Sequence, residues 1–131
     1  MKFELDYTVK TTHVFDHAVK RIEEEIAKSG MRVLHIHDVQ KTLGEKGFDR
    51  GPFKIIEFCS APYANALLNV DMRIGLCMPC KINVYVSGGH TVISGMRPVM
   101  LRQMFPEAAV GGIPEEIDQK IKTIIDNAKR P

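Results

Sequence analysis

The chain has 131 residues and a mass of 14.7 kDa, the size of one ordinary domain. Hydrophobic residues make up 44% and charged residues 26%, which argues against a disordered, collagen-like or disulfide-scaffold protein. The formal net charge of +2 is too small to indicate a nucleic-acid or anionic-membrane surface. No apolar run approaches the ~20 residues of a membrane helix. The N-terminus lacks the apolar stretch of a signal peptide, so we expect a single soluble, cytoplasmic domain over residues 1–131.

The first third of the chain predicts a strand, a helix and a second strand. Residues 3–10 alternate apolar and polar side chains, the period-two pattern of a strand with one buried face. Asp16 is the expected N-cap of a helix that Gly30 ends. The apolar stripe of this helix comprises Phe15, Val19, Ile22 and Ile26. A second strand follows at residues 31–39.

The middle of the chain predicts a loop, a strand and a short helix. Residues 40–52 hold several glycines among charged residues and predict a segment that is mostly a mobile loop. Residues 53–59 predict a third strand. Residues 62–70 have apolar side chains at helical spacing, with Pro62 near the first turn.

The last part of the chain predicts a hairpin and a final helix. Strands at 80–86 and 91–96 flank a turn at 87–90, where glycines supply the positive backbone angles that a hairpin needs. A short helical turn around Met100 precedes a helix that begins at Pro114. The apolar stripe of that helix comprises Ile117, Ile121, Ile124, Ile125 and Ala128.

This order of elements predicts an α+β fold. Clean alternation in the first, fourth and fifth strands favours an antiparallel sheet with helices packed on one face, a two-layer sandwich. The other face of such a sheet requires a partner, a ligand or water.

The cysteines are the first candidate site. Cys59, Cys77 and Cys80 are an odd number of thiols, which favours a reducing compartment. Cys77 and Cys80 form a Cys-x-x-Cys motif that brings two sulfurs within reach of one another or of one metal ion. The motif runs into a strand, so it lacks the helix N-terminus that lowers a thiol pKa in redox proteins. Three interpretations stay open: buried packing residues, thiol chemistry, or a metal site.

A metal site would need further ligands. Zinc usually takes four, so Cys59 and one of His35 or His37 would have to join the Cys-x-x-Cys pair. His35 and His37 share one face of a strand, a workable metal-chelating or acid–base geometry. The simpler interpretation places them on the polar sheet face or at a subunit contact. The seven methionines are typical of residues that fill gaps in a core.

Two segments carry a resemblance to a known family. Residues 58–67 and 74–85, with their paired cysteine blocks, resemble the domain of unknown function 302 family (DUF302). The resemblance covers residues 3–105, and residues 106–131 look like a C-terminal helical extension. It implies a β-α-β-β-β-β-α order of the TATA-binding-protein-like kind, without DNA binding, and a homodimer. Cys59 and Cys80 match the family's cysteines, whereas Cys77 is a departure from its pattern.

The sequence thus predicts a small cytosolic, dimeric binding or accessory protein. Its site is expected where the third strand ends at Cys59 and the fourth begins at Cys80, with Cys77 beside them, and it would handle a soft metal, sulfur or thiols. One alternative is a thiol-dependent oxidoreductase or sulfurtransferase with Cys80 or Cys59 as the nucleophile, which requires a lowered thiol pKa. Another is a structural dimerisation module without a ligand. Neither a nucleic acid nor a membrane is an expected partner, and no cofactor or substrate is assigned.

Overall fold

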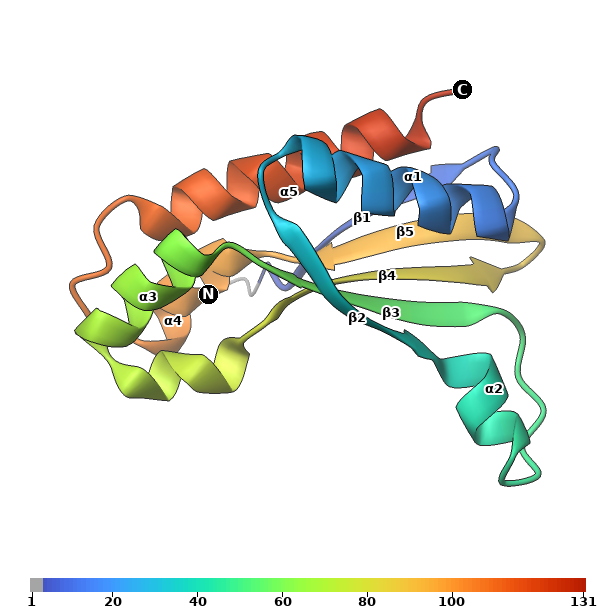
Figure 1. Cartoon of the computed structure of the whole chain (residues 1–131), viewed down its shortest axis with the longest axis horizontal. Coiled ribbons are helices and arrows are strands. Elements are labelled where there is room, and N and C mark those ends of the chain that lie inside the picture. The colour runs from blue at the N-terminus through green and yellow to red at the C-terminus, as the bar shows by residue number, and fades with distance from the viewer. Residues whose placement is uncertain (1–3) are drawn as a thin grey trace.

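A single antiparallel sheet organises the protein. The computed structural model describes residues 4–131 (Figure 1). Five strands lie in the order β1, β5, β4, β3, β2, and each neighbouring pair is antiparallel. The strands are β1 (Asp6–Thr11), β2 (Arg32–Asp38), β3 (Phe53–Cys59), β4 (Cys80–Ser87) and β5 (His90–Met96). The predicted α+β class is confirmed.

Two long helices cover one face of the sheet. α1 (Phe15–Lys28) and α5 (Ile113–Lys129) lie side by side above the strands in Figure 1. Their apolar stripes meet the inward side chains of the three central strands. The fully buried side chains of this core include Ile22, Ile26, Ile56, Phe58, Ile82, Val84, Ile93, Ile121, Ile124 and Ile125. Burial of this apolar surface is the main source of stability.

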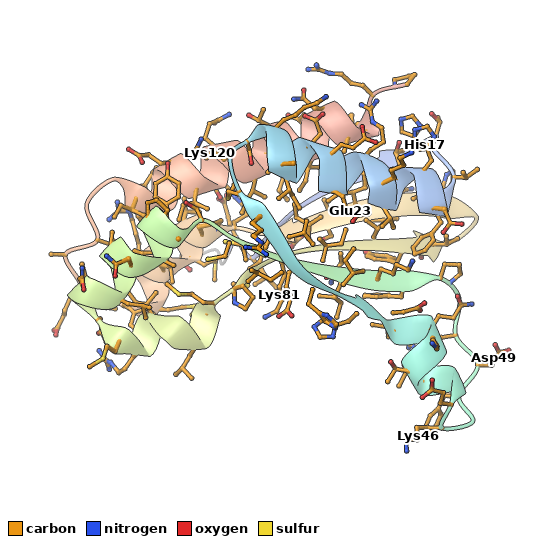
Figure 2. All side chains as sticks on the ribbon, viewed as in Figure 1. His17, Glu23, Lys46, Asp49, Lys81 and Lys120 are labelled. Carbon is orange, nitrogen blue, oxygen red and sulfur yellow. The ribbon has the colours of Figure 1, made fainter. Side chains whose placement is uncertain are left out.

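The opposite face of the sheet carries the alternate side chains of the same strands. Phe53 and Tyr85 stack there with ring centroids 5.1 Å apart. Lys81 points away from the face that the long helices cover (Figure 2). Alternation along β4 explains the pattern, since Ile82 and Val84 are buried between these outward residues.

Short helical segments gather at the end of the sheet opposite the β4–β5 hairpin (Figure 1). These are α3 (Ala61–Val70), the 3₁₀ helix η1 (Met72–Cys77), the 3₁₀ turn η2 (Pro98–Met100) and α4 (Leu101–Met104). α3 lies where the sequence predicted a helix, whereas η1 was not predicted. Within residues 4–131, none of the helices is long and apolar enough to cross a membrane.

One local prediction was wrong, and another held for only part of its segment. Asp16 is not the N-cap of α1: Val14 holds that position without a side-chain hydrogen bond, and Asp16 lies in the first turn, where its charge still suits the helix dipole. Most of the segment 40–52 lies outside helices and strands, as predicted, but α2 (Val39–Gly44) occupies its start and was not predicted. The Asp38 carboxylate caps α2 by accepting a hydrogen bond from the Lys41 backbone amide at 3.1 Å.

Most of the remaining helices and strands begin and end close to the residues predicted from the sequence. Gly88 and Gly89 adopt positive φ angles of 57° and 79° in the β4–β5 turn, as predicted. β1 begins at Asp6 rather than at residue 3. Of the predicted strand, Phe3 lies outside the described residues.

Candidate functional site

A cavity of about 50 Å³ lies where β3 ends and β4 begins. Segments from α3, η1, η2 and α4 close over it, and α5 contributes to its floor. All three cysteines line this cavity, together with five of the seven methionines. These methionines are Met31, Met78, Met96, Met100 and Met104. The cavity is therefore lined by sulfur-containing side chains from segments that lie far apart in the sequence.

The sheet positions two of the cysteines. Phe58 of β3 pairs with Cys80 of β4, and Cys59 follows Phe58 as the last residue of its strand. The expectation that these strand ends are adjacent is confirmed. Cys80 packs against the buried core, and antiparallel pairing of β3 with β4 brings Cys59 to the same end of the sheet.

The third cysteine comes from the short helical segments. Cys77 is the last residue of η1, and its thiol points to the Met104 thioether at the end of α4. The Cys77 Sγ atom donates a weak hydrogen bond to Met104 Sδ, with the two sulfurs 4.0 Å apart. The Cys-x-x-Cys motif thus runs from the end of a 3₁₀ helix into a strand, so no helix N-terminus activates its thiols.

Burial keeps these thiols protonated. It raises the pKa of Cys80 to about 11, with a further increase from the neighbouring Cys59 and a partial decrease from Lys81. Burial also raises the pKa of Cys59. The pKa of Cys77 is raised by burial as well, against an opposing effect of Lys81. All three are free thiols. A nucleophilic cysteine needs the opposite shift, so this environment gives no support to the thiol-enzyme alternative.

The two candidate histidines lie elsewhere. His35 and His37 of β2 contact each other edge to face, with ring centroids 4.4 Å apart. His37 Nε2 lies 2.7 Å from the Glu57 carboxylate on β3. Neither histidine lines the cavity. Across residues 4–131, no three His, Cys, Asp or Glu side chains converge as a ready metal-ligand cluster. The structure therefore does not assemble the mixed cysteine–histidine site.

Two sets of site residues were missed at the sequence level. The methionines gave no signal beyond their number. Arg97 also lines the cavity, with its side chain 17% exposed. It donates two hydrogen bonds to the Asp118 carboxylate, at 3.2 and 3.1 Å, and one to Glu4 at 2.6 Å. These carboxylates neutralise its charge, which leaves the cavity wall without a free cation at this position.

The fold and the cavity define a small α+β protein with a sulfur-lined site at one end of an antiparallel sheet. The chain belongs to the DUF302 family, because the model of that family, a domain of unknown function, matches residues 7–128. The match includes α5, whereas the resemblance in the sequence extended only to residue 105.

A solved relative has the same architecture. The chain is similar to the crystal structure of an uncharacterized conserved DUF302 protein from Bacillus stearothermophilus, with a TM-score of 0.89 and 31% sequence identity. The alignment covers 97% of this chain and 99% of that one. None of the curated proteins matches the chain.

Proposed function

We propose that this protein binds a soft, thiophilic metal ion in the cavity at the β3–β4 end of the sheet. One observation carries the proposal: three cysteines and five methionines line a single small cavity. Thiolate and thioether ligands favour soft ions such as Cu(I), and thiolates also bind Zn(II).

The size of the cavity favours an ion over an organic ligand. Sites for organic molecules enclose roughly 300–1,000 Å³, whereas one water needs about 10–15 Å³. The volume of about 50 Å³ is a few times that of one water and well below the range for organic ligands. A single ion fits this space, and a nucleotide or a sugar does not.

The ligands belong to two parts of the fold. Cys59 and Cys80 are held by strand pairing, whereas Cys77 and Met104 end short helical segments. Since three donors do not yet converge, η1 and α4 would close toward the strand ends as the ion binds. Each ligating thiol would lose its proton in that step, and the thiolates would balance the charge of the cation.

Competitive metal binding tests the proposal. The reduced protein is titrated anaerobically with Cu(I) against bicinchoninate, and separately with Zn(II) against a chromophoric chelator. We expect one equivalent of a soft ion per chain and a loss of this binding in the Cys59→Ser/Cys80→Ser double variant. The matched control is His35→Ala/His37→Ala, which should bind as the original chain does because neither ring lines the cavity. Failure of the chain to compete for either ion, or unchanged binding in the double cysteine variant, would contradict the proposal.

We also propose that the protein forms a homodimer in the cytoplasm. Phe53 and Tyr85 stack on the sheet face opposite α1 and α5, with Ile55 on the same face. A second copy packed on this face would cover the aromatic pair. Three free thiols fit a reducing compartment.

A further inference from the structure

Met104 differs from the other methionines of the cavity in its surroundings. Met31 and Met100 are 6% and 2% exposed, so packing alone accounts for them. Met104 is 49% exposed, and its sulfur faces a thiol rather than the core. A half-exposed apolar side chain at the rim of a cavity gains little from burial. The contact with the Cys77 thiol is therefore the feature that distinguishes Met104 from the other methionines.

The spacing of Cys77 and Met104 is that of two ligands of one ion. Two sulfurs that share an ion at about 2.3 Å, with an angle of about 120° between the bonds, lie about 4.0 Å apart. The observed distance between Cys77 Sγ and Met104 Sδ is 4.0 Å. The pair therefore meets this requirement at its present separation, and η1 and α4 would keep that separation as they move together toward the strand ends.

We propose that the Met104 thioether is a ligand of the bound ion and makes the site select Cu(I) over Zn(II). This inference rests on the proposed function. Cu(I) is a soft ion that accepts neutral thioethers, whereas Zn(II) takes thiolate, imidazole and carboxylate ligands and prefers four of them. Among the described residues, those lining the cavity include no His, Asp or Glu. Zn(II) would therefore find three thiolates at most, while Cu(I) gains the thioether as well.

The rim position of the pair also suits the uptake of an ion. Cys77 and Met104 come from η1 and α4, and Met104 is exposed to solvent, while Cys59 and Cys80 lie at the strand ends. A methionine side chain is unbranched and adapts to a new position readily. The rim pair would contact an arriving ion first and carry it toward the two thiols of the sheet.

The test replaces the thioether without changing the volume of the side chain. Met104→Leu conserves size and hydrophobicity, so the fold is expected to persist. Met72→Leu is the matched control, because Met72 is 83% exposed on η1 and does not line the cavity. Affinities for Cu(I) and Zn(II) are measured by chelator competition, and the number of sulfurs around Cu(I) by X-ray absorption.

We expect Met104→Leu to weaken Cu(I) binding by about tenfold or more while Zn(II) binding is unchanged. The sulfur shell around Cu(I) should lose one atom, and Met72→Leu should behave as the original chain. Met104→Cys should retain Cu(I) binding and strengthen Zn(II) binding, which keeps the test valid if the leucine variant folds poorly. Equal Cu(I) affinity and an equal sulfur shell in Met104→Leu would overturn this inference and leave the proposed function intact. An original chain that binds neither ion would overturn the proposed function itself.

Discussion

The Cys80 thiol should react unusually slowly with an alkylating agent. Burial raises its pKa from 9.0 to about 11. Only the thiolate is nucleophilic, so at pH 8 its reactive fraction is about 0.1%, against roughly 10% for a thiol with the ordinary value. The alkylating agent should therefore modify Cys80 about 100-fold more slowly in the folded chain than in the unfolded chain.

Iodoacetamide labelling followed by mass spectrometry measures this rate at each cysteine separately. The reaction is followed in buffer and in concentrated urea, where Cys80 loses its burial. The folded-state rate should rise about tenfold per pH unit and level off only near pH 11. A Cys80→Ser variant identifies the slow site, because it removes that site and leaves the other two.

Labelling of folded Cys80 at a rate within about threefold of the urea value at pH 8 would refute the link between burial and a raised pKa. The thiol-dependent enzyme would require a larger departure, with labelling that is fast well below pH 8.

Three further predictions concern stability and assembly. Gly95→Ala should lower the free energy of unfolding by about 1–3 kcal/mol in urea titrations, because the new alanine Cβ would lie 2.8 Å from the buried Ile125 Cδ1 atom. Unchanged stability would mean that α5 can shift freely over the sheet. Burial alone would raise the pKa of Glu25, but hydrogen bonds from Asn127 and Lys28 outweigh it and hold that pKa below its ordinary value. A carboxylate with a lowered pKa stabilises the fold at pH values above its pKa in the unfolded chain, and this stabilisation is lost as the pH falls through its pKa in the folded chain. Glu25→Gln should therefore lower the free energy of unfolding at pH 7 and lower it less near pH 3. An equal loss of stability at both pH values would contradict the prediction. The proposed homodimer should give a melting temperature that rises with protein concentration, and a monomer at micromolar concentration in sedimentation experiments would count against it.

Most of the fold followed from periodic patterns in the sequence. Alternation marked the strands, and apolar steps of three and four marked α1 and α5, because each pattern reflects burial on one face. The six residues of α2 are too few for such a pattern, and its evidence is the single cap by Asp38. Val14 begins α1 without a side-chain cap, so packing of the apolar stripe outweighs local capping there.

The site was only partly predictable, for a physical reason. The meeting of Cys59 and Cys80 follows from the order of two consecutive strands, which pair antiparallel. The approach of Met104 to Cys77 joins residues 27 positions apart on two short segments, and no local pattern encodes that contact. His35 and His37 were candidates because they are close in sequence, yet β2 directs them to Glu57 and to each other.

The division of the site between strands and short helices bears on how relatives could diverge. Phe58 and Cys80 at the strand ends pack in or against the core, so most substitutions there would disturb folding itself. Met72 and Leu76 of η1 are 83% and 87% exposed, and these two positions should tolerate exchange at little cost to stability. Relatives that keep the same sheet are thus free to vary the rim, and with it the chemical preference of the cavity, one surface residue at a time.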